Sequence, residues 1–284
     1  MKDLSDIQVI EHTLKRHGFD FSKKLGQNFI TDPDVCPQMA ELACSDADAV
    51  VEIGPGIGVL TQQLALRAKK VVAFELDRRL PAVLQETLSE FDNIEIINED
   101  FLKVDLNRLI EEKISGLRVA VCANLPYYIT SPIIMGILTA KAPITRAVFM
   151  VQKEAGERLC ALPGTREAGA VTIAVHYYAH PREVFSVPRT SFIPSPKVDS
   201  EVIELIPHKE PPVSVGDPVF FFRVVQAAFS QRRKTVVNGL SAGLGIGKAE
   251  ALAALERCGA HGRTRAEELT MEQFAALSRS LSVR

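Results

Sequence analysis

The sequence lacks the features that mark secreted, membrane-spanning and zinc-binding proteins. Its five cysteines are scattered and form no C-x-x-C pair, which argues against disulfides and against a zinc site. No apolar run is long enough to cross a bilayer, and the first residues hold no basic segment followed by an apolar core. We therefore expect a cytoplasmic protein without a metal ion or a membrane partner.

The chain also lacks an excess of charge of either sign. It holds 33 basic and 35 acidic residues, so any contact with nucleic acid must come from a local basic surface. The stretch 218–249 is such a surface, because it contains five basic residues and no acidic one. Solvated helix ends are the alternative explanation. The predicted phosphate contacts are Arg223, Arg232, Arg233 and Lys234, together with Lys23 and Lys24 near the start of the chain.

Length and proline content predict two domains. The 284 residues exceed one average domain, and prolines and a glycine cluster at about residues 207–217. We expect one domain over residues 1–208 and a smaller, all-α domain over residues 209–284 that binds RNA. No internal repeat or low-complexity segment is found.

Short apolar runs predict a mostly parallel sheet in the first domain. Buried strands are expected at 49–53, 71–75, 93–97, 117–122 and 145–152, with helical patterns between them. Residues 183–187 and 200–206 are expected to form an antiparallel pair that closes the sheet. Periodicity leaves residues 169–178 open between helix and strand. Seven strands with helices between them predict an α/β, Rossmann-like fold.

Glycines or polar residues follow four of these strands at one predicted edge. They are Gly54 in a G-x-G-x-G turn, Glu75, Asp100 and Asn124. The turn differs from the G-x-G-x-x-G dinucleotide fingerprint, and Pro55 removes an N–H group from it, so a ligand without a phosphate is favoured. An acid at the position of Glu75 can accept hydrogen bonds from both hydroxyls of a ribose, and Asp100 can accept one from an adenine amine.

The stretch Asn124-Leu125-Pro126-Tyr127 indicates chemistry on a nucleobase amine. The side-chain oxygen of Asn124 and the Leu125 carbonyl can accept hydrogen bonds from the two N–H groups of such an amine, which localises its lone pair. Tyr127 offers a ring on which a base can stack, worth about 1–3 kcal/mol. Phe192, in a loop held extended by two prolines, is a candidate for the second face. A turn with a packed Tyr127, and Phe192 as a buried loop anchor, remain the alternatives.

These motifs together resemble the KsgA-type small-subunit (16S) rRNA adenine N6,N6-dimethyltransferases, whose catalytic domain is similar to that of the Erm-type enzymes. Of the matching segments given in the next sentence, the last two, 192–198 and 228–235, favour the KsgA branch over the Erm branch. The matching segments, which span nearly the whole chain, are 25–29 (LGQNF), 52–58 (EIGPGIG), 75–77 (ELD), Asp100, 124–127 (NLPY), 192–198 (FIPSPKV) and 228–235 (AFSQRRKT).

The resemblance implies a class I methyltransferase that binds S-adenosylmethionine. It places Asn28 and the Ile30 backbone near the methionine moiety, Gly54 in the cofactor turn, Glu75 on the ribose, Asp100 on the adenine and Asn124 at the junction with the target base. The implied substrate is a pair of adjacent adenosines in the 3′-terminal hairpin of 16S rRNA, dimethylated by a monomeric enzyme during small-subunit assembly. An Erm-like methyltransferase, a catalytically inactive assembly scaffold and an NAD-linked oxidoreductase are the alternatives.

Overall fold

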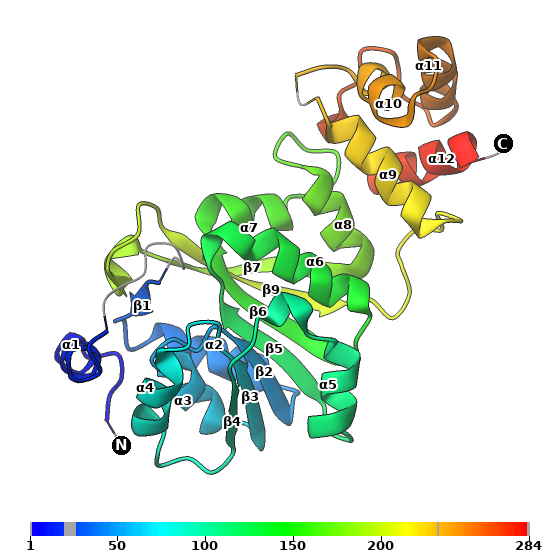
Figure 1. Ribbon diagram of the computed structural model, residues 1–284. Coiled ribbons are helices and arrows are strands. Elements are labelled where there is room, and N and C mark those ends of the chain that lie inside the picture. The colour runs from blue at the N-terminus through cyan, green and yellow to red at the C-terminus, as the bar shows by residue number, and fades with distance from the viewer. Residues whose placement is uncertain (1, 20–26, 232, 283–284) are drawn as a thin grey trace. The chain divides into compact units, whose positions relative to one another are not determined.

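The computed structural model describes residues 2–19, 27–231 and 233–282. Contacts between residues divide the chain into two compact units, one of residues 1–156 with 182–207 and one of residues 157–181 with 208–284 (Figure 1). The second unit includes residues 208–284, and the expected second domain was 209–284. It also takes in residues 157–181, which we had placed in the first domain, because the side chains of Ile173 and Tyr177 share a core with Phe221.

The first unit is built on a seven-stranded sheet with the order β4-β3-β2-β5-β6-β9-β7. Neighbouring strands from β4 to β6 are parallel, and β9 is antiparallel to β6. The predicted mostly parallel, seven-stranded sheet is thus confirmed. The strands are β2 (Ala49–Ile53), β3 (Lys70–Phe74), β4 (Ile94–Ile97), β5 (Val119–Asn124), β6 (Ile144–Gln152), β7 (Ala179–Val187) and β9 (Ser200–Pro207).

The central strands are buried on both faces, as their composition requires. All five residues of β2 are buried, and so are the first five of β5. Runs of valine, isoleucine and alanine suit such strands, because side chains on both sides of a parallel sheet pack against covering elements. The edge of this sheet that holds the carboxyl ends of β2, β3, β4 and β5 is therefore firmly positioned.

Helices before, between and after these strands complete the first unit. They are α1 (Ile7–Arg16), α2 (Val35–Cys44), α3 (Val59–Ala65), α4 (Leu80–Thr87), α5 (Leu106–Lys113) and α6 (Thr130–Ala140), and α7 (Lys153–Cys160) crosses into the second unit. Residues of α1 to α4 share one hydrophobic core with residues of the sheet.

A short ribbon joins two distant loops of the first unit. Strand β1 (Phe29–Ile30) pairs antiparallel with β8 (Phe192–Ile193), so that Ile30 lies opposite Phe192. This pairing fixes the segment that contains Asn28 against the proline-rich loop.

The second unit is all-helical apart from the start of β7. It contains α8 (Ala170–Tyr178), α9 (Pro218–Phe229), α10 (Val236–Leu244), α11 (Lys248–Arg257) and α12 (Met271–Ser282). Residues 169–178, which periodicity left open, form α8, because Ile173 and Tyr177 lie one turn apart and enter the core of this unit. The side chain of Asp217 caps α9 by accepting a hydrogen bond from the Val219 N–H group at 2.9 Å.

Helices α9 and α10 approach each other at a glycine. A Cβ atom added at Gly239 would lie 2.5 Å from the carbonyl oxygen of Ala227 and 2.9 Å from that of Ala228. Both obstacles are backbone atoms of α9, which cannot move without shifting the helix.

We predict that Gly239→Ala destabilises the protein by about 1–3 kcal/mol, because the added methyl group must separate two packed helices. The matched control is Gly136→Ala in α6, where an added Cβ would meet nothing within 4 Å. The control is expected to be neutral or stabilising by up to about 1 kcal/mol. Denaturant unfolding of both variants measures the difference, and equal stabilities would contradict the close approach.

Candidate active site

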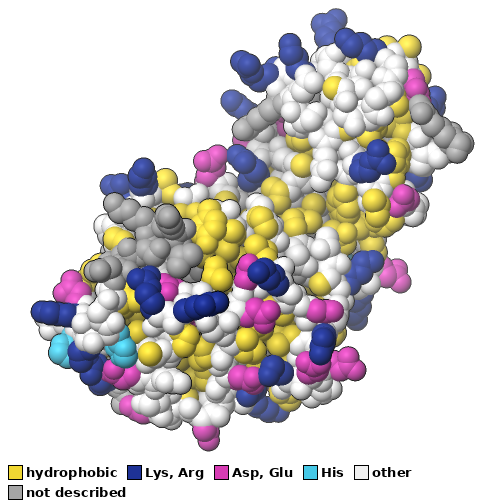
Figure 2. Space-filling model, in the orientation of Figure 1, with side chains coloured by type: hydrophobic (Ala, Val, Ile, Leu, Met, Phe, Trp, Pro, Cys, Tyr) yellow, Lys and Arg dark blue, Asp and Glu magenta, His cyan; other side chains and the backbone are white. Residues whose placement is uncertain are grey.

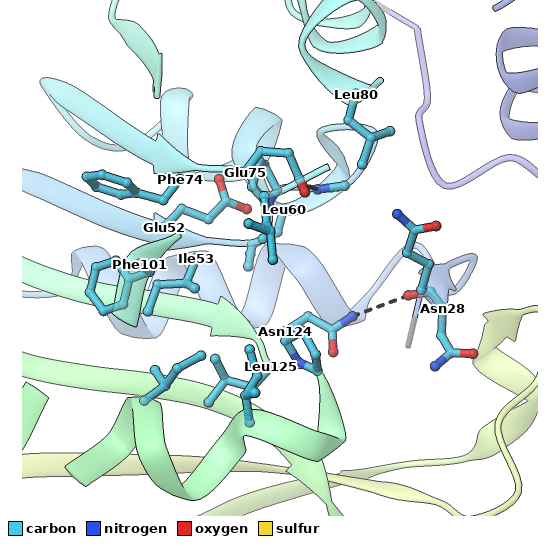
Figure 3. Close-up of a pocket in the computed structure, with 18 of the residues that line it drawn as sticks. Asn28, Glu52, Ile53, Leu60, Phe74, Glu75, Leu80, Phe101, Asn124 and Leu125 are labelled. Carbon is cyan, nitrogen blue, oxygen red and sulfur yellow. Dashed lines mark hydrogen bonds between the residues drawn. The ribbon is translucent and has the colours of Figure 1, made fainter. Parts of the chain in front are cut away.

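One pocket lies at the carboxyl edge of the first unit's sheet (Figure 3). It takes residues from the ends of β2, β3 and β5, from the segment after β4 and from the segment around β1. Of the predicted cofactor and catalytic residues, it brings together Asn28, Ile30, Gly54, Glu75, Asp100, Asn124, Leu125 and Tyr127.

The glycine turn after β2 brings bare backbone to the pocket. Gly54 and Gly56 have φ values of +71° and +60°, a region that L side chains rarely adopt. An added Cβ at Gly54 would meet nothing within 4 Å, whereas one at Gly56 would lie 3.0 Å from the ring of Phe29. The first glycine therefore leaves space beside the backbone, as the sequence predicts for a ligand-binding turn.

Acidic side chains dominate the charge of this pocket. Glu52, Glu75, Glu99 and Asp100 line it, and no lysine, arginine or histidine occurs among its described lining residues. The field of such a pocket favours a cationic ligand and opposes a phosphate, since charges interact strongly where water is scarce. The absence of a described basic residue thus disfavours a dinucleotide, in agreement with the glycine spacing.

Glu75 is buried at the end of β3, with 6% of its surface exposed. Its carboxylate accepts hydrogen bonds from the Asp77 N–H group at 2.8 Å and from the Gly56 N–H group at 3.3 Å. Burial outweighs these bonds and raises the pKa of Glu75 to about 7. The carboxyl group is therefore tied to the glycine turn and is close to changing charge at neutral pH.

Glu52 is a residue that sequence reasoning missed. It lies within β2, is 1% exposed and lines the pocket, and neither of its carboxylate oxygens has a hydrogen-bond partner among the described residues. Burial, with a smaller effect from the charge of Glu75, raises its pKa to about 8. The Thr61 hydroxyl, also buried, lies near the Glu52 carboxyl group and lowers its pKa, but burial has the larger effect. The signal that could have identified Glu52 is an acid inside a buried strand, directly before the glycine turn.

The side chain of Asn124 is held in one orientation. Its amide nitrogen donates a hydrogen bond to the Asn28 carbonyl oxygen at 3.4 Å (Figure 3). Because a carbonyl oxygen can only accept, this contact assigns the NH₂ end to Asn28, and among the described residues the Asn124 side-chain oxygen receives no hydrogen bond.

The next residues are held by the sheet and by a turn. The Leu125 N–H group donates to the Met150 carbonyl at 3.0 Å, and in the described part of the chain the Leu125 carbonyl receives no hydrogen bond. The Pro126 carbonyl, by contrast, accepts bonds from the Ile129 N–H group and the Thr130 hydroxyl. Two acceptors, Asn124 Oδ1 and the Leu125 carbonyl, thus remain available at the end of β5.

Tyr127 is half-buried beside these acceptors. Its hydroxyl lies 3.1 Å from Ser200 Oγ, and burial raises its pKa. The next residue, Tyr128, also lines the pocket and is 55% exposed, although we assigned it no role from the sequence. The ring of Tyr128 is therefore available as a further stacking surface.

The opposite wall of the pocket comes from the segment after β4. Asp100 accepts a hydrogen bond from the Leu102 N–H group at 3.1 Å, which caps the short helix 101–103. The ring of Phe101 packs edge-on against Phe74, with 5.5 Å between the ring centres. Asp100 and Phe101 both line the pocket.

Phe192 is not brought to the pocket lining. It is 5% exposed and lies in the hydrophobic core that contains residues of α1 to α4. Its pairing with Ile30 turns the side chain inward, so the structure favours the buried loop anchor over a second stacking face.

The predicted RNA contacts are described only in part. Lys23, Lys24 and Arg232 lie outside the described residues. Arg223, in α9, and Arg233 and Lys234, just after it, are exposed residues of the second unit. The guanidinium of Arg223 lies 6.0 Å from the Phe220 ring.

Comparisons with known proteins identify the family of this chain. The chain matches the family model described as ribosomal RNA adenine dimethylase over residues 18–282. It is 50% identical to the ribosomal RNA small subunit methyltransferase A of Geobacillus sp. (strain WCH70), over 99% of this chain and 98% of that protein.

Two solved structures are similar as well. The dimethyladenosine transferase from Plasmodium falciparum has a TM-score of 0.71 and 27% identity, with 88% of this chain and 95% of that chain covered. The 23S rRNA methyltransferase ErmE has a TM-score of 0.67 and 29% identity, with coverages of 89% and 99%. The fold and the pocket therefore define an enzyme of the class I, S-adenosylmethionine-dependent methyltransferase type. Within that class, the chain belongs to the ribosomal RNA adenine dimethylase family.

We predict that the unfolding free energy of Glu52→Gln, relative to that of the wild type, increases as pH rises. The Glu52 pKa is about 8 in the folded state and 4.5 in a model compound, so between these values the folded protein holds a proton that the unfolded chain has lost. The contribution of Glu52 to stability thus falls with increasing pH, and glutamine removes this loss. The difference in unfolding free energy between variant and wild type should grow by at least ~1 kcal/mol from pH 5 to pH 8.5.

Denaturant unfolding at the two pH values measures this change. Glu41→Gln on the exposed face of α2 is the control and should show no such trend. A difference for Glu52→Gln that is independent of pH would mean that the carboxyl group is ionised in the native protein.

Proposed function

We propose that this protein transfers methyl groups from S-adenosylmethionine to N6 of two adjacent adenosines in the 3′-terminal hairpin of 16S rRNA during small-subunit assembly, giving N6,N6-dimethyladenosine. Its relative from Geobacillus, similar over the full length, is named a small subunit methyltransferase A. The single observation that carries the chemistry is the orientation of Asn124, whose side-chain oxygen is left free by the bond to Asn28.

The pocket fits S-adenosylmethionine by charge. That molecule carries a cationic sulfonium and an α-ammonium group and has no phosphate, which suits a pocket lined by four acids and no described basic residue. We assign Asn28 and the Ile30 backbone to the methionine moiety, and Gly54 to the turn beside it. Glu75 is assigned to the ribose hydroxyls and Asp100 to the adenine amine.

The residues at the end of β5 would prepare the target amine for attack. The adenine N6 lone pair is delocalised into the ring, which makes this amine a poor nucleophile. Asn124 Oδ1 and the Leu125 carbonyl would accept hydrogen bonds from the two N–H groups of this amine. Such bonds favour a pyramidal nitrogen with a localised lone pair. Tyr127 would stack on the base, which must be extruded or come from an unpaired loop.

S-adenosylmethionine supplies, when bound, a methyl group on a positively charged sulfur that leaves as a neutral thioether. The protein therefore needs no strong general base, and positioning of the amine should give most of the rate enhancement. After the first transfer the monomethyl amine must be repositioned, with its remaining N–H group on one of the two acceptors. The same residues then serve the second transfer.

The basic residues of the second unit would bind RNA phosphates. Arg223, Arg233 and Lys234 are exposed and have no acidic partner among the described residues. With Arg232, Lys23 and Lys24 they form the phosphate contacts that we propose, and residues 209–284 form the domain that docks on the ribosomal subunit.

We further propose that the enzyme acts as a monomer in the cytoplasm, where ribosomal subunits assemble. No helix in the described part of the chain is long and apolar enough to cross a membrane. In that same part, no three residues of histidine, cysteine, aspartate or glutamate are grouped to hold a metal ion.

We predict that Asn124→Ala lowers methyl transfer to unmethylated small subunits by at least ~100-fold, since it removes an acceptor aimed at the reacting amine. Binding of S-adenosylmethionine, measured by calorimetry, should change by less than about threefold. The control is Asn107→Ala in α5, which should keep full activity. The Asn107 side-chain amide donates a hydrogen bond to the Ala140 carbonyl and does not line the pocket. An Asn124→Ala enzyme that still turns over would contradict the lone-pair mechanism.

A second prediction concerns the affinity for S-adenosylmethionine as a function of pH. Because the pKa of Glu75 is raised to about 7 and that of Glu52 to about 8, both groups gain negative charge as pH rises from 6 to 9. Affinity for the cationic molecule should therefore increase with pH across this range. Glu75→Gln should weaken binding by roughly tenfold or more at pH 8 and flatten the dependence, since only Glu52 still titrates.

Calorimetric titration at several pH values measures this effect. Glu111→Gln on the exposed face of α5 is the control and should leave the wild-type curve unchanged. Affinity that falls with pH would contradict an electrostatic attraction between the ionised acids of the pocket and the sulfonium of the bound molecule.

A further inference from the structure

Three basic residues lie together on the side of the pocket next to Tyr127, and neither the predicted phosphate contacts nor the proposed chemistry includes them. Lys153 is the first residue of α7, and Arg189 and Lys197 belong to the connection between β7 and β9. All three are exposed. We call Lys153, Arg189 and Lys197 the basic rim.

Hydrogen bonds place the basic rim beside the stacking residue. The Tyr127 hydroxyl contacts Ser200 Oγ, and Ser200 lies opposite Gln152 in the β6–β9 pairing. One residue further out, the Lys153 N–H group donates to the Asp199 carbonyl at 3.0 Å.

The same aspartate fixes the loop. The Arg189 N–H group donates to Asp199 Oδ1 at 2.9 Å, and its guanidinium reaches the Lys197 carbonyl at 3.5 Å. The Ser195 hydroxyl closes the loop by donating to the Arg189 carbonyl at 2.8 Å. The three basic residues are thus joined to one short segment, 199–200, that touches Tyr127.

The charges of the basic rim are available to a ligand. Within the described residues, none of the three side chains forms an ion pair, and the one polar contact of the Arg189 guanidinium is to a neutral carbonyl. The acids nearest in sequence are Asp199, whose carboxylate accepts the Arg189 backbone N–H, and Glu154. Glu157 follows Lys153 by four residues on α7, so the count of charges gives no positive excess, and the basic rim is available to a ligand because its side chains form no ion pair among the described residues.

Figure 2 agrees with this placement. It shows dark-blue side chains at the end of the first unit where Figure 1 places the connection between β7 and β9. Apolar side chains surface beside them, and Val198 of the same loop is 43% exposed.

The division of charge matches the parts of a nucleotide. A nucleobase is neutral and can enter a pocket lined by acids, but its flanking phosphates are repelled from it. A strand that inserts one base beside Tyr127 must therefore carry its phosphates past the outer side of that residue, where the basic rim lies. We propose that Lys153, Arg189 and Lys197 bind the backbone phosphates next to the target adenosine and so position the extruded base. This inference rests on the proposed function. It adds a second group of RNA contacts, on the first unit, to those proposed on the second unit.

The test compares the double variant Lys153→Gln/Lys197→Gln with the control Lys69→Gln/Lys141→Gln. Both control residues precede strands, β3 and β6, at the amino-terminal edge of the sheet, and both are exposed. Each double variant removes two positive charges from the first unit. Arg189 is left intact, because its guanidinium helps to hold the loop.

The probe is the small ribosomal subunit from a strain that lacks its own dimethyltransferase. For the basic-rim variant, the KM for subunits should rise by roughly five- to tenfold, and the slope of log affinity against log salt should become shallower by about 1.4, as expected for two lost single-strand phosphate contacts. The rate at saturating subunits and the affinity for S-adenosylmethionine should match the wild type. The control should match it in every respect.

The possible failures are distinguishable. Wild-type protein that neither binds nor methylates these subunits would overturn the proposed function and, with it, the basic rim. Wild-type transfer with equal salt slopes for the two double variants would overturn the basic rim alone. A lower rate at saturating subunits, with an unchanged slope of log affinity against log salt, would also overturn the basic rim. The loop would then act by positioning Tyr127 and not by binding phosphates.

Discussion

The bond from the Asn124 amide to the Asn28 carbonyl is the contact on which the site depends. It joins the end of β5 to the segment before β1, and that segment is held in turn by the pairing of Ile30 with Phe192. A carbonyl partner removes the ambiguity of an amide side chain, because only the NH₂ end can face it. The acceptor is thereby aimed without any contribution from a ligand. Preorganised acceptors of this kind cost no reorganisation during the reaction, which is why they suit catalysis.

Electrostatics separates the ligands of this protein by chemical class. The pocket holds two buried acids, Glu75 and Glu52, whose pKa values burial raises to about 7 and about 8, and it holds no described basic residue. Basic residues lie instead outside the pocket, beside Tyr127 in the first unit and along α9 in the second. The proposed function needs a cationic cofactor and a polyanionic substrate to bind a chain of almost no net charge, and this separation of the two signs of charge is what supports it.

Much of this arrangement could be predicted from the sequence, and the exceptions have physical causes. Strand ends were predictable because buried β-branched runs stop abruptly at Gly54, Glu75 and Asn124, and parallel strands bring such ends to one edge. The buried position of Phe192 could not be predicted, because Phe192 pairs with Ile30 in a short ribbon and the two residues are more than a hundred positions apart in the sequence. Glu52 was missed for a related reason: whether a carboxylate inside a strand finds a partner depends on neighbouring elements.

The measurement that tests the central claim most directly is transfer of labelled methyl groups from S-adenosylmethionine to small subunits from a strain without its own dimethyltransferase, followed by identification of the modified nucleosides. The account predicts label in N6,N6-dimethyladenosine, at two adjacent positions of the 3′-terminal hairpin of 16S rRNA. Tight binding of the subunits without transfer would contradict it in favour of an assembly scaffold. Label in large-subunit RNA alone would contradict it in favour of an Erm-like enzyme.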